Sequence, residues 1–287
     1  MTIQAIDNYI SGKDTSRTDI IQFVKDYGQK QLQLGKKSEG TVRGYNKCAD
    51  KLAKFAGRQK VYFDEINKEF LESYEQYCID EGNNIFTRWD VITKFFHKFM
   101  KLAKYPTEIH GYDWPRPPKE GSKVYLTLAE LDKIADLDLT GYEKQVRDHF
   151  LLGCYSGLRF SDWTRYEIET TVSGKALKVQ AKKNKEPIYL SLERRPRLKA
   201  VIDKLDKCTL NLEVSNRLLK LIAAKAGISK SVSTHVARHT CAVLHAELGY
   251  SKEFVAQLLG VTLGSVEYYY KITRRKLRNE EELFGGL

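Results

Sequence analysis

The sequence contains no apolar run of the ~18 residues that a membrane-spanning helix requires. Its five cysteines are dispersed without a CxxC pair, so neither a disulfide framework nor zinc-ligand spacing is present. The first residues, MTIQAIDNYISGKD, lack the apolar stretch of a secretory signal peptide. These absences argue against a membrane protein and a secreted disulfide-rich protein. We expect a cytoplasmic protein without a metal or cofactor.

Proline is also scarce, and four of the six prolines lie between residues 105 and 123. Proline cannot continue a helix, so this segment, YPTEIHGYDWPRPPKEGSK, predicts an extended linker. A chain of 287 residues suggests two domains. We therefore expect an N-terminal tail over residues 1–17, a helical domain over 18–105, a linker over 106–123 and a second domain over 124–287.

Acidic residues are outnumbered, with 37 Asp and Glu against 48 Lys and Arg. The formal net charge is +11 and the pI is about 9.2. Such an excess of positive charge favours a polyanionic partner, most simply nucleic acid. Charge alone leaves open a soluble protein that is merely basic.

Apolar periodicity predicts a mainly α fold with one small antiparallel sheet in the second domain. A capping box at Thr127 and Glu130 is expected to open the first helix after the linker. The other predicted helices cover residues 20–34, 41–55, 68–78, 87–102, 143–155, 197–205, 212–226, 236–248, 252–259 and 266–283. The predicted strands cover residues 168–172, 177–180 and 188–192, with a lysine-rich turn at 181–186.

The predicted helix over residues 87–102 has two different faces. An apolar stripe that includes Phe95 and Phe99 is typical of a core-facing surface. Lys94 and Lys98 stand among the basic residues of the other face and are candidates for phosphate contacts. The alternative for both lysines is a solvated helix face.

Two basic segments of the second domain are weak indications when each is taken alone. In GLRFSD, Arg159 follows a glycine that ends a predicted helix, so its guanidinium could point into a cleft. In KKNKEPIYLSL, the lysines at a hairpin tip could reach a DNA groove. These lysines are Lys182, Lys183 and Lys185. Surface arginine and solvated lysine are the alternatives.

The segment THVARHT concentrates two imidazoles and a guanidinium within five residues. His235 and Arg238 are three residues apart and share one helix face, and His239 follows directly. His235 and His239 also have the i, i+4 spacing of zinc ligands. The glutamate of HExxH is missing, however, and Arg238 would repel a cation, so we expect no metal here.

Three successive tyrosines, Tyr268, Tyr269 and Tyr270, project from the last predicted helix ~100° apart. At least one is expected to face away from the core, and Tyr268 is the one that we expect inside it. The alternative is that these tyrosines only pack in the core and form an aromatic belt at an interface.

Together these residue types suit transesterification at a phosphodiester. Tyrosine is a nucleophile whose phosphate ester conserves bond energy, so resealing needs no ATP. Two arginines supply bidentate, preorganised charge stabilisation. A lysine or histidine supplies proton transfer.

The motifs GLRFSDW, KNKEPIYLSL, HVARHT and YYKIT occur in the order and spacing of the tyrosine recombinases. The chain resembles this phage-type integrase family, and within it the integrases of Bacteroidetes mobile elements. The resemblance covers nearly the whole chain. It implies a tyrosine recombinase fold, with a helical SAM-like core-binding domain before the linker and a mostly helical α+β catalytic domain after it.

The resemblance also implies roles for single residues. Arg159 resembles the first catalytic arginine, Asp162 the acidic residue that orients it, and Lys183 the hairpin lysine that protonates the leaving 5′ oxygen. His235, Arg238 and His239 resemble the family's HxxRH box. The implied enzyme is a metal- and ATP-independent DNA strand transferase that forms a 3′-phosphotyrosyl intermediate. It would act as a homo-tetramer on double-stranded DNA in the nucleoid of a bacterium or phage-infected cell, with possible accessory DNA-bending proteins.

The sequence departs from the family pattern at Val261, where a histidine usually stands. The site therefore either lacks the phosphate donor that this histidine provides, or Thr262 provides it instead. The nucleophile also has two candidates, because the downstream YxKI register selects Tyr269 whereas counting from Val261 selects Tyr270. We prefer Tyr269, since a turn tolerates a deletion more readily than the helix that aims the hydroxyl.

Two alternatives to a site-specific recombinase remain open. The first alternative is a topoisomerase of type IB, and the second is a catalytically impaired DNA-binding relic. The chain begins close to the core-binding domain, so an upstream arm-binding domain is expected to be either lacking or removed.

Overall fold

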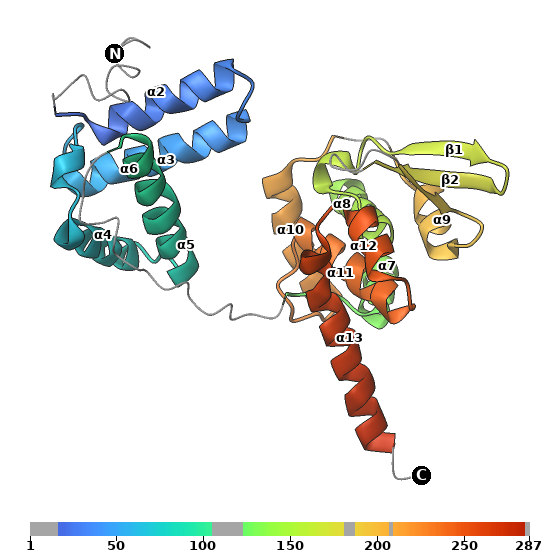
Figure 1. Ribbon diagram of the computed structural model, residues 1–287. Helices are drawn as coiled ribbons and strands as arrows, with labels where there is room; N and C mark the ends of the chain where they lie inside the picture. Colours follow the sequence, from blue (N-terminus) through green and yellow to red (C-terminus); the bar gives the residue numbers. More distant parts are fainter. Residues whose placement is uncertain (1–16, 105–122, 181–186, 207–208, 285–287) are drawn as a thin grey trace. The chain divides into compact units, whose positions relative to one another are not determined.

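The computed structural model describes residues 17–104, 123–180, 187–206 and 209–284, and within these it leaves the side chains of 93–94 and 275–284 undescribed. The chain divides into two compact units, Met1–Glu120 and Gly121–Leu287 (Figure 1). The expected mainly α fold with a small antiparallel sheet is confirmed. The division falls within the predicted linker, of which only Lys123 belongs to the described residues. The domain limits set from the sequence stay a prediction.

The first unit is a bundle of helices around an aromatic core. Its elements are α2 (Ile20–Gln33), α3 (Glu39–Ala56), η1 (Phe63–Glu65), α4 (Lys68–Asp80), α5 (Ile85–Asp90), η2 (Val91–Phe96) and α6 (His97–Leu102). The predicted apolar stripe is in the core, since Phe96 and Phe99 are fully buried and Phe95 is 5% exposed. One detail differs from the expected single helix, because η2 is a π-helical segment between α5 and α6.

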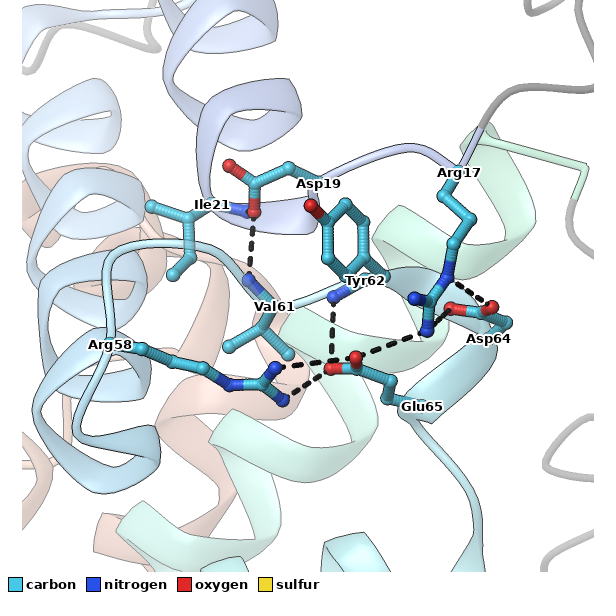
Figure 2. Close-up of polar contacts among 8 residues, drawn as sticks. All are labelled: Arg17, Asp19, Ile21, Arg58, Val61, Tyr62, Asp64 and Glu65. Carbon is cyan, nitrogen blue, oxygen red and sulfur yellow. Dashed lines mark hydrogen bonds and ion pairs between the residues drawn. The ribbon is translucent and has the colours of Figure 1, made fainter.

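A polar network secures the start of α2 (Figure 2). The Asp19 carboxylate accepts the backbone N–H groups of Ile21 and Gln22 and also that of Val61, 42 residues away. A side-chain cap of this kind satisfies N–H groups that the first helical turn leaves without partners. Beside this cap, the Glu65 carboxylate forms ion pairs with Arg17 at 3.2 Å and with Arg58 at 2.5 Å. The network ties the beginning of the bundle to the loop that precedes η1.

The second unit wraps helices around one large core beside a three-stranded sheet. Its helices are α7 (Leu128–Ala135), α8 (Gly141–Ser156), η4 (Phe160–Asp162), α9 (Pro196–Ile202), α10 (Leu212–Lys225), α11 (Thr234–Glu247), α12 (Lys252–Leu259) and α13 (Leu263–Phe284). Its strands, β1 (Glu167–Thr171), β2 (Gly174–Val179) and β3 (Ile188–Ser191), pair antiparallel in the order β1-β2-β3. The predicted capping box at Thr127 and Glu130 is confirmed at the start of α7.

Helix α11 is the central element of the second unit and packs against both α8 and α13. Most of its side chains are buried, including Ala237, Cys241 and Ala242. Asn216 of α10 accepts the backbone N–H of Thr234 at 2.8 Å, so a neighbouring helix caps α11 where Ser233 makes no side-chain cap. The position of α11 is thus set by packing on several sides. None of the helices in the described ranges has the length and hydropathy needed to cross a bilayer.

Candidate active site

Arg238 projects from α11 toward the ends of two other helices. It is 8% exposed, and its two terminal nitrogens donate to the carbonyls of Gly157 and Leu259. Gly157 ends α8 with a φ of +73°, and a Cβ there would lie 2.8 Å from a methyl carbon of Leu259. Only glycine combines that backbone conformation with so close an approach. The residue that ends α8 therefore also fixes one partner of Arg238.

Arg159 lies two residues beyond Gly157 and reaches the same place. Its Nη2 is 3.5 Å from the carbonyl oxygens of both Leu259 and Gly260, at the C-terminal end of α12. The last carbonyls of a helix lack partners within the helix and carry its partial negative charge. Two guanidinium groups thus converge on one carbonyl, that of Leu259.

This convergence concentrates positive charge. Burial, followed by the charge of Arg159, lowers the pKa of Arg238 to about 10. An anion bound between the two guanidinium groups would relieve their repulsion and gain charge-assisted hydrogen bonds. The arrangement is suited to a phosphate group.

Asp162 is the residue expected to orient Arg159. It lies in η4, which begins directly after Arg159. Its carboxylate accepts the Ser161 hydroxyl at 3.0 Å and lies 3.7 Å from Nη2 of Arg165. Its described contacts are therefore local, and a role in orienting Arg159 stays a prediction.

A histidine and a tyrosine form a hydrogen bond beside the arginines. Nδ1 of His239 lies 2.5 Å from the hydroxyl of Tyr269, and the ring of His235 stands at 82° to that of His239 with centroids 4.5 Å apart. Burial, then the nearby charges of His235, Lys123 and Arg238, lowers the pKa of His239 to about 4. Its imidazole is therefore neutral near pH 7, and Nδ1 can accept the tyrosine proton.

The pKa values of His235 and Tyr269 also shift in the direction that favours the uncharged form of each side chain. Partial burial, then the charges of Arg238, Lys123 and Arg159, lowers the pKa of His235. Burial raises the pKa of Tyr269 to about 12, and the charge of Arg238 opposes that rise. The hydroxyl of Tyr269 is thus protonated at neutral pH, with a neutral acceptor already in contact.

The three tyrosines of α13 point to three different places. Tyr269 is 5% exposed and lies on one stripe with buried Val266 and Thr273. The Tyr270 hydroxyl donates to the carbonyl of Tyr250 at 2.6 Å, away from His239. The expectation that Tyr268 would be the core residue was wrong, because the stripe at positions 266, 269 and 273 faces α11 and leaves Tyr268 only partly buried.

Lys123, which no motif in the sequence indicated, lies beside Tyr269. Its Nζ is 3.4 Å from the Tyr269 hydroxyl and 4.6 Å from the centre of that ring. A single lysine that follows a proline-rich segment belongs to no motif or periodic pattern. No signal in the sequence distinguished it from other lysines.

The predicted DNA-binding and hairpin lysines are tested little by the structure. Lys182, Lys183 and Lys185 lie outside the described residues, and so does the side chain of Lys94. The ammonium of Lys98 lies 4.0 Å from the ring centre of Tyr45 and donates to its hydroxyl, so it is engaged within its own unit. Phosphate contacts by these lysines stay a prediction.

The turn that carries Val261 separates α12 from α13. Val261 is partly buried against the core, and the Thr262 hydroxyl lies 2.9 Å from that of Ser265. Thr262 is therefore paired at the start of α13, and its service as a substitute phosphate donor stays a prediction. Across the described ranges of the chain, no three His, Cys, Asp or Glu side chains gather as ligands for a metal ion.

Comparison with known proteins identifies the first unit and the fold. Residues 19–105 match the phage integrase SAM-like domain. No curated protein sequence matches the chain.

Three solved structures illustrate the similarity of the fold. A fragment of lambda integrase, bound as a dimer to a COC′ core site, is 18% identical with a TM-score of 0.64, over 87% of this chain and 94% of that one. The Tn1549 transposon integrase in complex with a circular intermediate DNA is 13% identical with a TM-score of 0.63, over 92% and 99%. The XerH site-specific recombinase in a post-cleavage complex with its difH substrate is 13% identical with a TM-score of 0.60, over 85% and 80%. The chain thus carries a phage integrase SAM-like domain and has the tyrosine recombinase fold.

Proposed function

We propose that the protein is a site-specific DNA recombinase that cuts and rejoins duplex DNA through a phosphotyrosyl intermediate. The observation that carries this proposal is the Tyr269 hydroxyl, hydrogen-bonded to neutral His239 next to the paired guanidinium groups. A nucleophile, a proton acceptor and a cradle for an anion are the parts that phosphodiester transesterification needs.

In the proposed reaction, Tyr269 Oη attacks the scissile phosphorus and the bond from phosphorus to the 5′ oxygen breaks. The tyrosyl proton passes to Nδ1 of His239, which the hydrogen bond already joins to the hydroxyl. Arg159 and Arg238 stabilise charge on the equatorial oxygens, and His235 lies beside them. Lys183 protonates the departing 5′ oxygen, a role that rests on the family resemblance.

Tyr269 is preferred to Tyr270 as the nucleophile for a geometric reason. The Tyr270 hydroxyl is bonded to a backbone carbonyl between α11 and α12, whereas Tyr269 faces the HxxRH segment. A one-residue shift along a helix turns a side chain by ~100°, so the two hydroxyls cannot share one site. The sequence register and the geometry support the same residue.

The partner in this proposal is double-stranded DNA. The net charge of +11 and the SAM-like domain support it, as does the presence of DNA in the lambda integrase, Tn1549 integrase and XerH structures. The family resemblance adds further expectations. These are assembly as a tetramer, accessory DNA-bending proteins, a nucleoid location and an origin in a Bacteroidetes mobile element.

A covalent-adduct assay tests the proposal. The substrates are nicked duplexes tiled over the DNA that flanks the gene, since a nick lets the cleaved fragment diffuse away and traps the intermediate. We expect a protein–DNA adduct that survives denaturation and is absent with Tyr269→Phe, while that variant still binds DNA.

Two other outcomes would contradict the proposal. Binding without any adduct would favour the DNA-binding relic, which Val261 motivates. Relaxation of plasmids lacking any defined site, without joining of two sites, would indicate a topoisomerase of type IB.

A further inference from the structure

We propose that Lys123 is an additional catalytic residue, whose ammonium group holds the Tyr269 oxygen for attack and stabilises the negative charge that develops on it. The proposal rests on the proposed function, because it requires Tyr269 to be the nucleophile. It is carried by the placement of Lys123 among groups that the sequence motifs had already singled out.

Backbone contacts on both sides fix the position of Lys123. Its own N–H donates to the Tyr268 hydroxyl at 2.7 Å, and the N–H of fully buried Leu126 donates to the Thr240 hydroxyl at 3.0 Å. Thr240 directly follows His239 in α11, and Tyr268 directly precedes Tyr269 in α13. The segment that carries Lys123 is thus fastened to the two helices that supply the nucleophile and its acceptor.

The side chain of Lys123 uses this fixed backbone to reach the nucleophile. Its Nζ lies 3.4 Å from Tyr269 Oη, 4.6 Å from the centre of that ring and 5.1 Å from the centre of the Tyr268 ring. Two aromatic faces attract the ammonium at these distances. A preorganised cation of this kind acts without reorganisation during the reaction.

The chemistry of the attack gives such a group a role. As the bond from Tyr269 Oη to phosphorus forms, the hydroxyl proton leaves for His239 and the oxygen carries partial negative charge. Burial makes that charge costly, since it raises the pKa of Tyr269 to about 12. The ammonium of Lys123 offsets the cost and keeps its own proton throughout. Its charge also lowers the pKa of His239, which keeps the acceptor neutral.

The test measures single-turnover adduct formation with saturating nicked DNA. Lys123→Met removes the charge and keeps the length of the side chain, whereas Lys123→Arg keeps a charge. Lys133→Met, at an exposed position of α7, is the matched control for charge loss in the same unit. We expect about a hundredfold slower adduct formation by Lys123→Met, partial recovery by Lys123→Arg and an unchanged rate for Lys133→Met. DNA affinity should stay within about twofold, because this ammonium serves the nucleophile rather than a phosphate.

The pH profile separates charge stabilisation from a structural role. The charge of Lys123 is one of the causes that lower the pKa of His239, so Lys123→Met should raise that pKa and move the rise of the cleavage rate with pH to higher pH. A wild-type rate for this variant at saturating DNA, or a slower rate with an unmoved pH profile and no recovery by Lys123→Arg, would each overturn the proposal. Absence of an adduct with the wild-type protein would instead refute the proposed function, and the Lys123 proposal with it.

Discussion

Arg159 and Arg238 meet at the carbonyl of Leu259 because two helix ends are brought together there. Each guanidinium can bind a phosphate through two parallel hydrogen bonds, which the single ammonium of lysine cannot reproduce. The partners of Arg238 are backbone carbonyls, so its position does not depend on another flexible side chain. The arginine is therefore held in place without a bound anion.

Replacing Arg238 by lysine tests this arrangement. We expect Arg238→Lys to slow adduct formation about a hundredfold or more, because one preorganised donor pair is lost although the charge remains. Single-turnover cleavage on trapped substrates measures the change. Arg217→Lys, at an exposed position of α10, is the control and should cleave normally. Cleavage by Arg238→Lys at the wild-type rate would exclude Arg238 from the phosphate site.

Single residues were predictable from the sequence where a motif set their spacing. The HxxRH segment was recognised in this way, and its His239 lies at the Tyr269 hydroxyl; the catalytic roles of its residues stay a prediction. Lys123 was not predictable, because its neighbours in space, Tyr268 and Tyr269, lie about 145 residues along the chain. The burial of Tyr269 rather than Tyr268 was open to prediction, since Val266, Tyr269 and Thr273 have helical spacing.

At the scale of elements, the end of α8 couples the fold to the site. Gly157 has a positive φ, a Cβ there would lie 2.8 Å from Leu259 and 3.1 Å from Cys241, and its carbonyl is a partner of Arg238. An added methyl group would force α8 and α12 apart and move Arg238.

Alanine at this helix end has a matched control in the same unit. Gly227 also has a positive φ, +69°, but a Cβ there meets nothing within 4 Å. We expect Gly227→Ala to lower the free energy of unfolding by about 1 kcal/mol through backbone strain alone, without changing cleavage. Gly157→Ala should cost about 2–4 kcal/mol and also slow cleavage, because steric overlap adds to the strain. Denaturant unfolding and the adduct assay measure both effects, and equal behaviour of the two variants would contradict the coupling.

Four histidines of α8 and α11 make the second unit sensitive to acid. Burial is the first cause that lowers the pKa of His149, His235, His239 and His245. A pKa lower in the folded than in the unfolded state means that the unfolded chain binds more protons below pH 6.5. Stability should therefore fall as the pH drops from about 6.5 toward each folded pKa, by at most about 1.4 kcal/mol per pH unit for each histidine.

A single variant isolates this effect from the protonation of carboxylates. His245 is 5% exposed, and its lowered pKa disfavours protonation in the folded state. His245→Gln removes the contribution of this residue to the pH dependence of stability. Unfolding of the wild type and of His245→Gln should be compared at pH 7.5 and pH 5.5. The wild type is expected to lose more stability between these two values, whereas equal losses would show that His245 does not contribute.

Most elements of the fold could be predicted from the sequence, because apolar periodicity and caps are local properties. Helix α12 begins and ends at the predicted residues, and the other helices in the described ranges differ by a few residues at their ends. The π-helical segment η2 was not predictable, because its apolar stripe is equally compatible with a continuous α-helix. It is packed in place by the aromatic core of the first unit, where Phe95 and Phe96 contact each other edge to face.

At the scale of the whole molecule, positive charge should govern association with DNA. The formal net charge is +11, and each phosphate neutralised on binding releases counterions. We expect the affinity for duplex DNA to fall steeply and linearly on logarithmic axes as salt rises, with a slope that reflects several phosphate contacts. Binding isotherms from low to moderate salt measure this slope. A flat response would count against a DNA-binding surface built from lysine and arginine.

The most direct test of the account identifies the residue that carries DNA in the covalent intermediate. Adduct formed on nicked DNA is digested with nuclease and protease, and the nucleotide-bearing peptide is sequenced by mass spectrometry. We predict that the modification lies on Tyr269, whose hydroxyl is bonded to His239. A nucleotide on Tyr270 or on any other residue would contradict the site described here.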